Sequence, residues 1–472
     1  MEMKILLINP PIKNMLTTEV PEMVTEERGF NPPLGIMYIA AYLEKYTDNE
    51  VRILDADVEE LSYEQIKQEI RKRKPDIVGL SAMTFTLIDC MILAKIVKEI
   101  DKNIKVIFGG PHPHIYPLET INLPYVDYVV MGEGEYTFTH LVENINSVKR
   151  LKLKKGIVFK EDGKIIHTGM PELIQDLDNI PFPARHLTPY KKYSSLLARR
   201  SPVTTMITSR GCPYKCLFCM RPHLGKKFRA RSAKNVVDEI EECVNIGIKE
   251  FLMYDDTFTV ERKRVMDICN EIIRRRVDIG WDVRARVNTV DYELLKKMKK
   301  AGCERIHYGV EKGNQEQLNI LRKGITLKQV KNAFRLTKKA GIGTLAYFMI
   351  GGPEETRKTV MQSINFAKMI KPDYAHFSIT TPFPATDLYN LALKKAIIKK
   401  DVWKEFAKKP GKDFVPPLWD ENLSREEMIS LLRMAYKKFY TRPVYIINRI
   451  LRMKSFHEFK TKVNAGLKIF RL

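Results

Sequence analysis

Three cysteines stand close together in one short segment of the chain. Cys212, Cys216 and Cys219 lie in the run SRGCPYKCLFC, with the spacing C-x3-C-x2-C. Iron–sulfur clusters are held by cysteine thiolates, and three thiolates can bind three of the four irons of a cubane. The fourth iron then has no protein ligand and can chelate a small molecule. The spacing therefore predicts a [4Fe–4S] cluster with one open iron.

The remaining cysteines limit the alternatives to such a cluster. The chain has seven in all, and an odd number with three tightly grouped argues against a disulfide framework and for a reducing compartment. A structural zinc site would need a fourth ligand, for which His223 is a candidate, but zinc sites often use two C-x2-C pairs. No second pair is present, so the iron–sulfur cluster is favoured.

The elements that would position this segment begin with a series of short apolar strands. Residues 4–10, 51–57, 76–82, 105–110 and 127–133 have the pattern of buried strands, and helical spacing of apolar residues separates them. This alternation predicts a Rossmann-like α/β domain with a parallel sheet. Ligands bind such sheets outside the carboxyl ends of the strands, where this chain carries Pro10, Pro11, Ser81, Gly109, Gly110, His112, Gly132, Glu133 and Gly134.

A second alternation of strands and helices surrounds the cysteines. Six βα units in series predict a partial, TIM-like (β/α)6 barrel, whose chemistry should lie at the C-terminal ends of its strands. Its strands are expected at 203–208, 249–254, 281–287, 304–310, 344–350 and 374–380. The predicted division of the chain is a Rossmann-like domain 1–145, a hairpin and linker 146–200, the barrel 201–400 and a basic helical extension 401–472.

The phrase TSRGCPYKCLFC and the βα domain before it resemble a known family. The chain resembles the radical S-adenosylmethionine (SAM) superfamily, and its layout is similar to the cobalamin (B12)-binding branch of methyltransferases and the anaerobic oxidative cyclase of chlorophyll synthesis. The resemblance implies that the open iron binds SAM and that one electron cleaves it to a 5′-deoxyadenosyl radical. It also implies bound cobalamin and a one-electron donor such as ferredoxin or flavodoxin.

The same resemblance implies which barrel residues contact SAM. Phe218 matches the aromatic position near the adenine, and Asp255 and Asp256 end the second strand, where a carboxylate would accept the methionyl ammonium. Asp256 could instead cap the next helix. The other implied contacts are Arg284 and Arg286 for the SAM carboxylate or the substrate, Glu311 for the ribose, and Gly351, Gly352 and Glu354 for the adenine, although the last three also suit a plain strand-to-helix turn.

The implied cobalamin site lacks one feature that many relatives have. The motif D-x-H-x-x-G, whose histidine binds cobalt from below, is absent, so the resemblance implies a cobalamin without that ligand. His112 and His114 are candidate ligands, although loop histidines are more often simple polar residues.

Several functions remain open on these observations. The favoured one is cobalamin-dependent methylation of an unactivated carbon. The alternative is radical SAM oxidative cyclisation, or formation of C–C or C–O bonds without methyl transfer, with a lipid among the substrates considered. A non-catalytic metal-binding or nucleic-acid-binding protein is a remote third. A methylthiotransferase is disfavoured, because that family carries three cysteines in its N-terminal domain and this chain has only Cys90 there.

Charge is divided unevenly along the chain. Residues 1–145 hold 14 Lys and Arg against 23 Asp and Glu, whereas the whole chain has a net charge of +23. The basic part could face an anionic small molecule, a nucleic acid or a membrane, but solvated helix faces are the favoured explanation. The basic, amphipathic stretch 443–472 suits either peripheral membrane contact or a cap over the barrel. Neither a signal peptide nor an apolar run of membrane length is found, which predicts a cytoplasmic protein.

Overall fold

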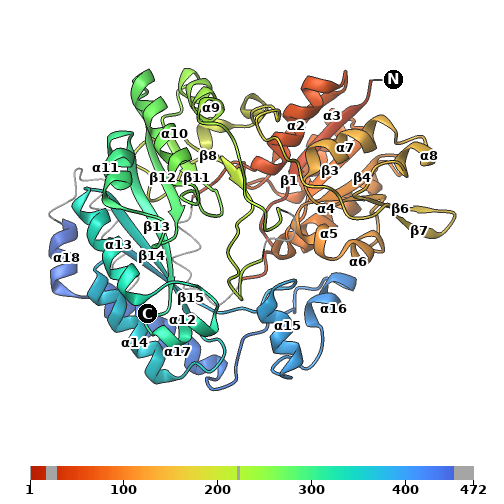
Figure 1. The fold of residues 1–472 in the computed structure, drawn as a ribbon. Helices are drawn as coiled ribbons and strands as arrows, with labels where there is room; N and C mark the ends of the chain where they lie inside the picture. Colours follow the sequence, from red (N-terminus) through yellow and green to blue (C-terminus); the bar gives the residue numbers. More distant parts are fainter. Residues whose placement is uncertain (1, 18–28, 221–223, 451–472) are drawn as a thin grey trace.

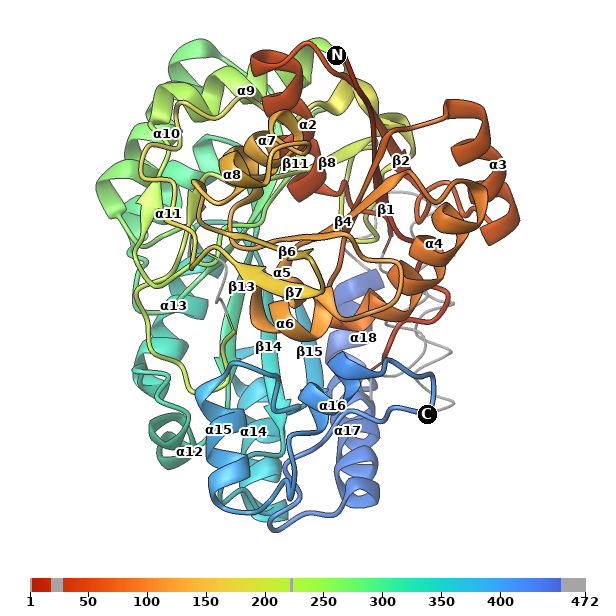
Figure 2. The same ribbon diagram turned by 90° about the vertical axis from the view of Figure 1, so that its right-hand side faces the viewer.

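The computed structural model describes residues 2–17, 29–220 and 224–450. Two α/β halves lie next to each other, the N-terminal half on the right of Figure 1 and the barrel half on the left. The helices between residues 387 and 440 run along the lower side of the molecule (Figures 1 and 2).

Seven strands build the sheet of the N-terminal half: β1 Lys4–Asn9, β2 Glu50–Asp55, β3 Ile77–Ser81, β4 Lys105–Gly109, β5 Tyr128–Val130, β6 Ile157–Glu161 and β7 Lys164–His167. Their order is β2-β1-β3-β4-β5-β6-β7, with β1 to β5 parallel. The hairpin β6–β7, expected to belong to the linker, pairs antiparallel with β5 and extends this sheet. Its turn at Asp162 and Gly163 has positive φ at both positions, as a two-residue hairpin prefers.

Helices cover both faces of this sheet, which explains why its strands are apolar almost throughout. Helices α2 Leu34–Tyr46 and α7 Gly134–Glu143 pack on the face of Ile5 and Leu7. Helices α3 Tyr63–Arg73 and α4 Leu87–Ile100 pack on the opposite face, against Leu6 and Ile8. The short helices are α5 Pro111–Ile115, α6 Pro117–Ile121 and α8 Val148–Leu151.

Six parallel strands build the barrel half: β8 Val203–Met206, β11 Glu250–Met253, β12 Gly280–Ala285, β13 Cys303–Glu311, β14 Gly343–Ile350 and β15 Tyr374–Ile379. Their order is β15-β14-β13-β12-β11-β8, so the barrel stays open between β8 and β15. A two-residue pair, β9 Ser209–Arg210 with β10 Arg229–Ala230, follows β8. The predicted fold class, a Rossmann-like sheet followed by a partial six-stranded barrel, is confirmed.

The outer face of the barrel sheet is covered by amphipathic helices (Figure 1). These are α9 Ala233–Asn245, α10 Arg262–Arg275, α11 Tyr292–Lys300, α13 Leu327–Lys339 and α14 Arg357–Ile370, with the short α12 Gln315–Ile320 between two of them. Side chains at the N-caps of four of them accept backbone N–H groups that the helix leaves unpaired; they are Ser232, Asp291, Thr326 and Thr356.

The C-terminal extension contacts both halves. It contains α16 Val402–Lys408, α17 Arg425–Tyr440 and α18 Pro443–Ile450, and it follows α15 Asp387–Lys394, the last helix of the predicted barrel segment. Trp403 of α16 is buried in the core of the N-terminal half. The hydroxyls of Tyr436 and Tyr440 bond the free backbone edge of β15, at 2.8–3.3 Å from the N and O atoms of Phe377 and Ala375, and so protect an edge strand.

The predicted membrane contact of the C-terminal stretch falls mostly on residues 451–472, which lie outside the described part of the chain. It therefore stays a prediction. Among the helices that the structure describes, none is long and apolar enough to cross a membrane.

Candidate functional site

The three cysteines lie on the loop between β9 and β10, at the C-terminal end of the first barrel strand. Cys212 is buried, Cys216 and Cys219 are half-buried, and none of them is in a disulfide. Gly211 has φ +81°, and a Cβ atom there would collide with the carbonyl of Lys227, so the loop needs glycine before its first cysteine. Cys216 and Cys219 line a cavity of about 100 Å³ with Tyr214, Lys215, Lys226, Ala385 and Asp387.

The donor set of this loop suits an iron–sulfur cluster better than a single metal ion. Three thiols from one short loop match a cubane that has one open iron. Each thiolate of a cubane binds a different iron, so the sulfurs need not converge on one point. In agreement, no three His, Cys, Asp or Glu side chains in the described residues are placed to hold one ion. His223, the candidate fourth zinc ligand, lies outside those residues.

Two cations lie against the cysteine loop. One guanidinium N–H of Arg286 points to the sulfur of Cys216 at 3.5 Å, and the guanidinium stacks on Tyr214 at 3.7 Å from the ring centroid. The ammonium of Lys323 lies 5.7 Å from the ring centroid of Phe218 and pairs with Glu311 at 2.6 Å. A positive charge next to a sulfur, such as that of Arg286, stabilises a thiolate ligand. Neither Tyr214 nor Lys323 stood out in the sequence.

The two aspartates after β11 differ in their surroundings. Asp255 is fully buried, and its oxygens accept from the backbone N–H and hydroxyl of Thr208 at 2.6 Å and from the hydroxyl of Ser209 at 2.5 Å. Both oxygens therefore hold the chain just before the cysteine loop. Asp256 is half-buried next to Thr257, whose hydroxyl lies 3.7 Å from the sulfur of Cys212.

The ends of β13 and β14 are joined by a buried ion pair. Lys312 is completely buried. Its ammonium donates to the carboxylate of Glu355 at 2.6 Å and to the carbonyl of Gly351 at 2.8 Å. The N–H of Gly351 donates to the same carboxylate at 2.5 Å, so both backbone groups of Gly351 are bonded within the protein. Beside it, Gly352 has φ +129° and open space where a Cβ would lie, which leaves room for a flat ligand. The Glu354 side chain is exposed.

The ends of β3 and β4 form the open part of the N-terminal sheet edge. Gly110 has φ +98°, and a Cβ there would lie 3.0 Å from the carbonyl oxygen of Ala82, whereas the position of Gly109 is almost free. Ser81 is half-buried, and Pro10 and Pro11 are buried. By contrast, Cβ atoms at Gly132 and Gly134 would collide with Pro171 and Ile39 at 2.5 and 2.8 Å.

His112 is the buried histidine of this edge. Its Nδ1 lies 3.1 Å from the Thr84 hydroxyl, and its Nε2 has no hydrogen-bond partner in the described part of the chain. A buried polar atom without a hydrogen-bond partner costs folding free energy. A bound group that pairs with Nε2 would remove that cost. Ligation of cobalt by His112 or by His114 stays a prediction.

His112 should make stability fall in mild acid. Burial lowers the pKa of His112 to about 3, while an unfolded histidine titrates near about 6.5. As the pH falls below about 6.5, the unfolded chain takes up this proton first, so the native state loses about 1.4 kcal/mol per pH unit. We expect His112→Gln to remove this part of the slope in urea unfolding measured between about pH 6.5 and 4.

The exposed His186 is the matched control for that measurement, because its side chain is 66% exposed. His186→Gln should leave the wild-type slope in place. A His112→Gln protein whose unfolding free energy depends on pH as steeply as the wild type does would contradict this account.

A buried ion-pair network joins the two halves beside the cysteine loop. Glu133, at the end of β5, accepts from Arg210 at 2.8 Å and from Arg229 at 2.7 Å, and Glu135 accepts from Arg210 at 2.5 Å. The N–H of Ile174 also donates to Glu133 at 2.7 Å. Both oxygens of Glu133 are thus engaged by the protein, and the predicted cobalamin residue has a clear role in domain contact.

Apolar contacts bring the cysteine loop to the strand ends of the N-terminal sheet. Leu217 is part of the same buried cluster as Ala82, directly after β3, and Phe218 packs against that cluster. The rings of Phe85 and Phe383 meet edge-on at 5.3 Å, which joins the loop after β3 to the loop after β15. The C-terminal edges of the two sheets therefore adjoin.

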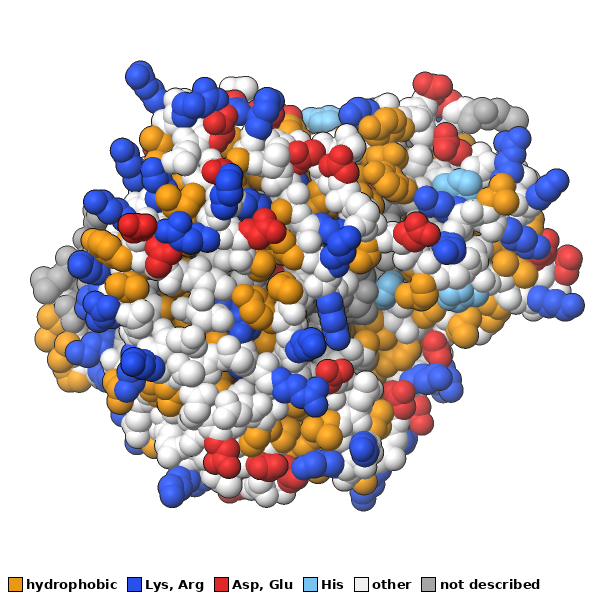
Figure 3. All heavy atoms as spheres, viewed as in Figure 1, with side chains coloured by type: hydrophobic (Ala, Val, Ile, Leu, Met, Phe, Trp, Pro, Cys, Tyr) orange, Lys and Arg blue, Asp and Glu red, His pale blue; other side chains and the backbone are white. Residues whose placement is uncertain are grey.

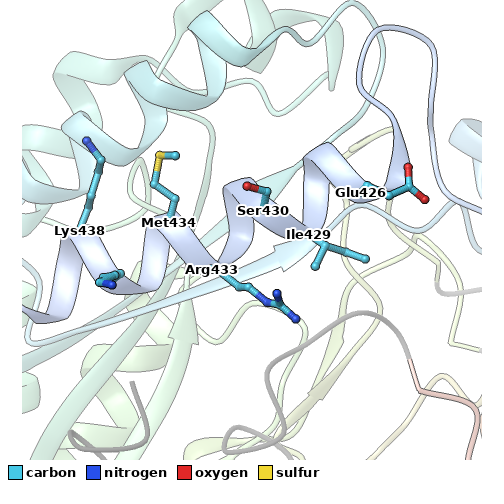
Figure 4. Close-up of a pocket in the computed structure, with 7 residues that line it drawn as sticks. Glu426, Ile429, Ser430, Arg433, Met434 and Lys438 are labelled. Carbon is cyan, nitrogen blue, oxygen red and sulfur yellow. The ribbon is translucent and has the colours of Figure 1, made fainter. Parts of the chain in front are cut away.

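A larger hollow lies elsewhere, along the exposed side of α17 (Figure 4). It has a volume of about 660 Å³ and is lined by Glu426, Ile429, Ser430, Arg433, Met434, Lys437 and Lys438. It shares no residue with the cysteine loop, and it holds no sulfur ligand or strand end.

Two family models match the chain in the order of its two halves. The B12 binding domain matches residues 23–142, and the radical SAM superfamily matches residues 206–367. An uncharacterized methyltransferase of Pyrococcus horikoshii is 37% identical over 96% of this chain and 96% of its own length. The chain belongs to the cobalamin-binding branch of the radical SAM superfamily. The predicted family is thus confirmed.

Two further comparisons support this branch. An anaerobic magnesium-protoporphyrin IX monomethyl ester cyclase of Rubrivivax gelatinosus is 30% identical over 88% of this chain and 75% of its own length. The structure of the cobalamin-dependent SAM radical enzyme OxsB, with aqua-cobalamin and SAM bound, has the same fold with a TM-score of 0.76, at 20% identity over 99% of this chain and 72% of that one.

Family membership defines the class of enzyme and its cofactors. The protein is a radical SAM enzyme that uses a [4Fe–4S] cluster, SAM and cobalamin, and its reaction is a methylation or a cyclisation. The residues that hold each cofactor are proposals, taken up next.

Proposed function

We propose that this enzyme transfers a methyl group from SAM, by way of cobalamin, to an unactivated carbon of a small molecule. When bound, the cluster supplies the electron that breaks a carbon–sulfur bond of SAM, and cobalamin supplies a carrier for the methyl group. The observation that supports the proposal most is the adjacency of the two sheet edges, because Phe85 after β3 touches Phe383 after β15. Both cofactors can then act on one substrate.

Each half contributes its own residues to this proposed site. Cys212, Cys216 and Cys219 hold the cluster, while Arg286 stabilises the charge of the thiolates. Glu311 is positioned by Lys323 for the ribose. The other proposed SAM contacts are Phe218, Asp256, Gly352 and Glu354, and the proposed cobalamin contacts are Pro10, Pro11, Ser81, Gly109, Gly110 and His112.

Two of the residues implied by the resemblance serve the site indirectly in this proposal. Asp255 holds the chain before the cysteine loop through Thr208 and Ser209. Gly351 is fixed by Lys312 and Glu355, and so orients the neighbouring Gly352 toward the ligand.

The products of SAM separate methyl transfer from other radical reactions. Protein reconstituted anaerobically with iron, sulfide and hydroxocobalamin is given deuteromethyl-SAM, a reductant and a small-molecule extract of its source cells. We expect S-adenosylhomocysteine, 5′-deoxyadenosine and a deuteromethyl-labelled product. The proposal is wrong if the protein takes up no cobalamin or never forms S-adenosylhomocysteine.

Oxidative cyclisation is the second candidate, supported by the 30% identity with the cyclase of Rubrivivax gelatinosus. In the same experiment it gives 5′-deoxyadenosine and an unlabelled product with fewer hydrogen atoms. On the face shown in Figure 3, Lys and Arg side chains are interspersed with acidic ones rather than gathered in the stripe that a nucleic-acid-binding surface has.

A further inference from the structure

The inner face of the barrel sheet carries side chains that lie outside the hydrophobic core under the outer helices. Successive side chains of a strand point to opposite faces, and one set, including Val283, Ile306 and Phe377, lies in the core under the outer helices. The other set is half-buried or exposed, and we call it the barrel lining: Tyr254, Arg284, His307, Tyr347 and His376. Strand alternation therefore places these side chains on the side of the sheet that faces the interior of the partial barrel.

Strand register places the members of the barrel lining next to one another. Arg284 on β12 is opposite His307 on β13, and Tyr347 on β14 is opposite His376 on β15. Below them, Arg305 donates to the carbonyl of Leu197 at 2.6 Å, so the linker closes the bottom of this interior. The cysteine loop lies at the opposite, C-terminal edge of the sheet.

Arg284 is a cation with no anionic partner in this lining. Its exposed guanidinium stacks on the ring of Tyr254 at 4.2 Å from the centroid. Within the described ranges, no oxygen of another residue lies within hydrogen-bond distance of that guanidinium. Arg286, two residues further along the same face, already contacts Cys216. Arg284 therefore lies roughly 7 Å deeper, the length of two strand residues.

The other titratable groups of the interior are paired or neutral. Asp282 pairs with Arg305 at 2.7 Å. Burial lowers the pKa of His307, and it lowers the pKa of His376 to about 4, so both rings are neutral near pH 7. His307 is bonded to the Tyr347 hydroxyl at 3.1 Å, and His376 to the Tyr436 hydroxyl at 3.1 Å. Among the described residues, no carboxylate therefore forms an ion pair with Arg284.

We propose that the barrel lining binds the substrate, and that the substrate is a planar, unsaturated molecule with an anionic group that pairs with Arg284. The inference rests on the proposed function and names the substrate class for that site. A guanidinium binds a carboxylate or phosphate through two parallel hydrogen bonds, and stacking on an aromatic ring keeps its fork oriented. The rings of Tyr347 and His376, which meet edge-on at 5.5 Å, offer flat surfaces to the unsaturated body.

Three probes with one ring system separate the anion from the ring: 2-naphthoate, 2-naphthyl phosphate and neutral 2-naphthamide. Their affinities are measured by isothermal titration of the enzyme reconstituted with cluster, cobalamin and SAM. We expect at least one anion to bind about ten times more tightly than the amide, which corresponds to about 1.4 kcal/mol. The carboxylate and phosphate probes tell which anion the site prefers.

Arg284→Gln keeps a polar side chain and removes the charge. This variant should bind the preferred anion about ten times more weakly, because the charge of Arg284 supplies that factor. Its affinities for the amide and for SAM should stay unchanged. Tyr347→Leu should lower the affinity for all three probes. Arg357→Gln is the matched control, because Arg357 is an exposed arginine on the outer helix α14, and it should behave as the wild type.

Several outcomes overturn the proposal. They are equal affinities of the three probes for the wild type, no measurable binding of either anion, and an unchanged preference in Arg284→Gln. Loss of SAM affinity in Arg284→Gln also overturns it, because the guanidinium would then bind the SAM carboxylate. Failure of the proposed function is visible separately in the same samples, as missing cluster or cobalamin absorbance.

Discussion

Protein carrying Cys216→Ala is expected to lose its [4Fe–4S] cluster and to cleave no SAM. Two thiolates hold only two irons of a cubane, and the half-buried Cys216 has no sulfur neighbour outside the loop that could replace it. Since enzymes accelerate reactions by roughly a million-fold or more, loss of the cluster should bring 5′-deoxyadenosine formation below detection. Iron content, the absorbance of the cluster and the electron paramagnetic resonance of the reduced protein measure the effect.

Cys269→Ala is the matched control for this prediction. Cys269 is a buried cysteine of α10 in the barrel core, away from the loop. Its loss should cost about 1 kcal/mol of folding free energy, as an ordinary core truncation does, while iron content and SAM cleavage stay at wild-type levels. If Cys216→Ala kept full iron and activity, or if the purified protein held zinc in place of iron, the cluster assignment would be wrong.

The cysteine loop and the fold could be predicted from the sequence because both produce patterns among residues that are close together in the chain. Three cysteines within eight positions are a motif by themselves. The alternation of apolar strands and amphipathic helices also repeats along the chain. All six predicted barrel strands end within two residues of the observed ends of β8, β11, β12, β13, β14 and β15. The parallel sheets follow from that repetition, since strands joined by helical crossovers must run parallel.

Side-chain partners far apart in the sequence could not be predicted in this way. Glu133 meets Arg229 across 96 residues, and nothing near either residue indicates the other. Period-two alternation places Arg284 and Arg286 on one face, but only the structure shows that Arg286 touches the cysteine loop and Arg284 does not. Strand-end position likewise could not tell that Asp255 bonds the chain of Thr208.

The ion pairs between the N-terminal half and the barrel half also explain why charge is divided unevenly along the chain. An acidic N-terminal half and a basic barrel half suit an interface in which carboxylates of one meet guanidiniums of the other. Glu133 and Glu135 supply the first, and Arg210 and Arg229 supply the second. Because Arg210 directly precedes Gly211 and Cys212, this interface also fixes the start of the cysteine loop relative to the N-terminal sheet.

Removing the charge of Glu133 is expected to cost about 3–5 kcal/mol of folding free energy, the usual cost of breaking a buried ion pair. In Glu133→Gln the guanidinium of Arg229, whose side chain is 2% exposed, stays buried without its anionic partner. Urea unfolding measures the loss, and hydrogen exchange of the segment that contains Arg210 and Cys212 shows whether the loop is released. We expect faster exchange there and in α7.

Two further variants serve as controls for the Glu133→Gln measurement. Asp267→Asn removes the exposed partner of Lys263 on α10 and should change stability by less than about 0.5 kcal/mol, as surface ion pairs do. The double variant Glu133→Gln with Arg229→Gln should recover part of the loss, because it removes the stranded charge together with its partner. A loss below about 1 kcal/mol in Glu133→Gln, with exchange at Cys212 unchanged, would mean that apolar contacts such as Phe85 with Phe383 hold the two halves together on their own.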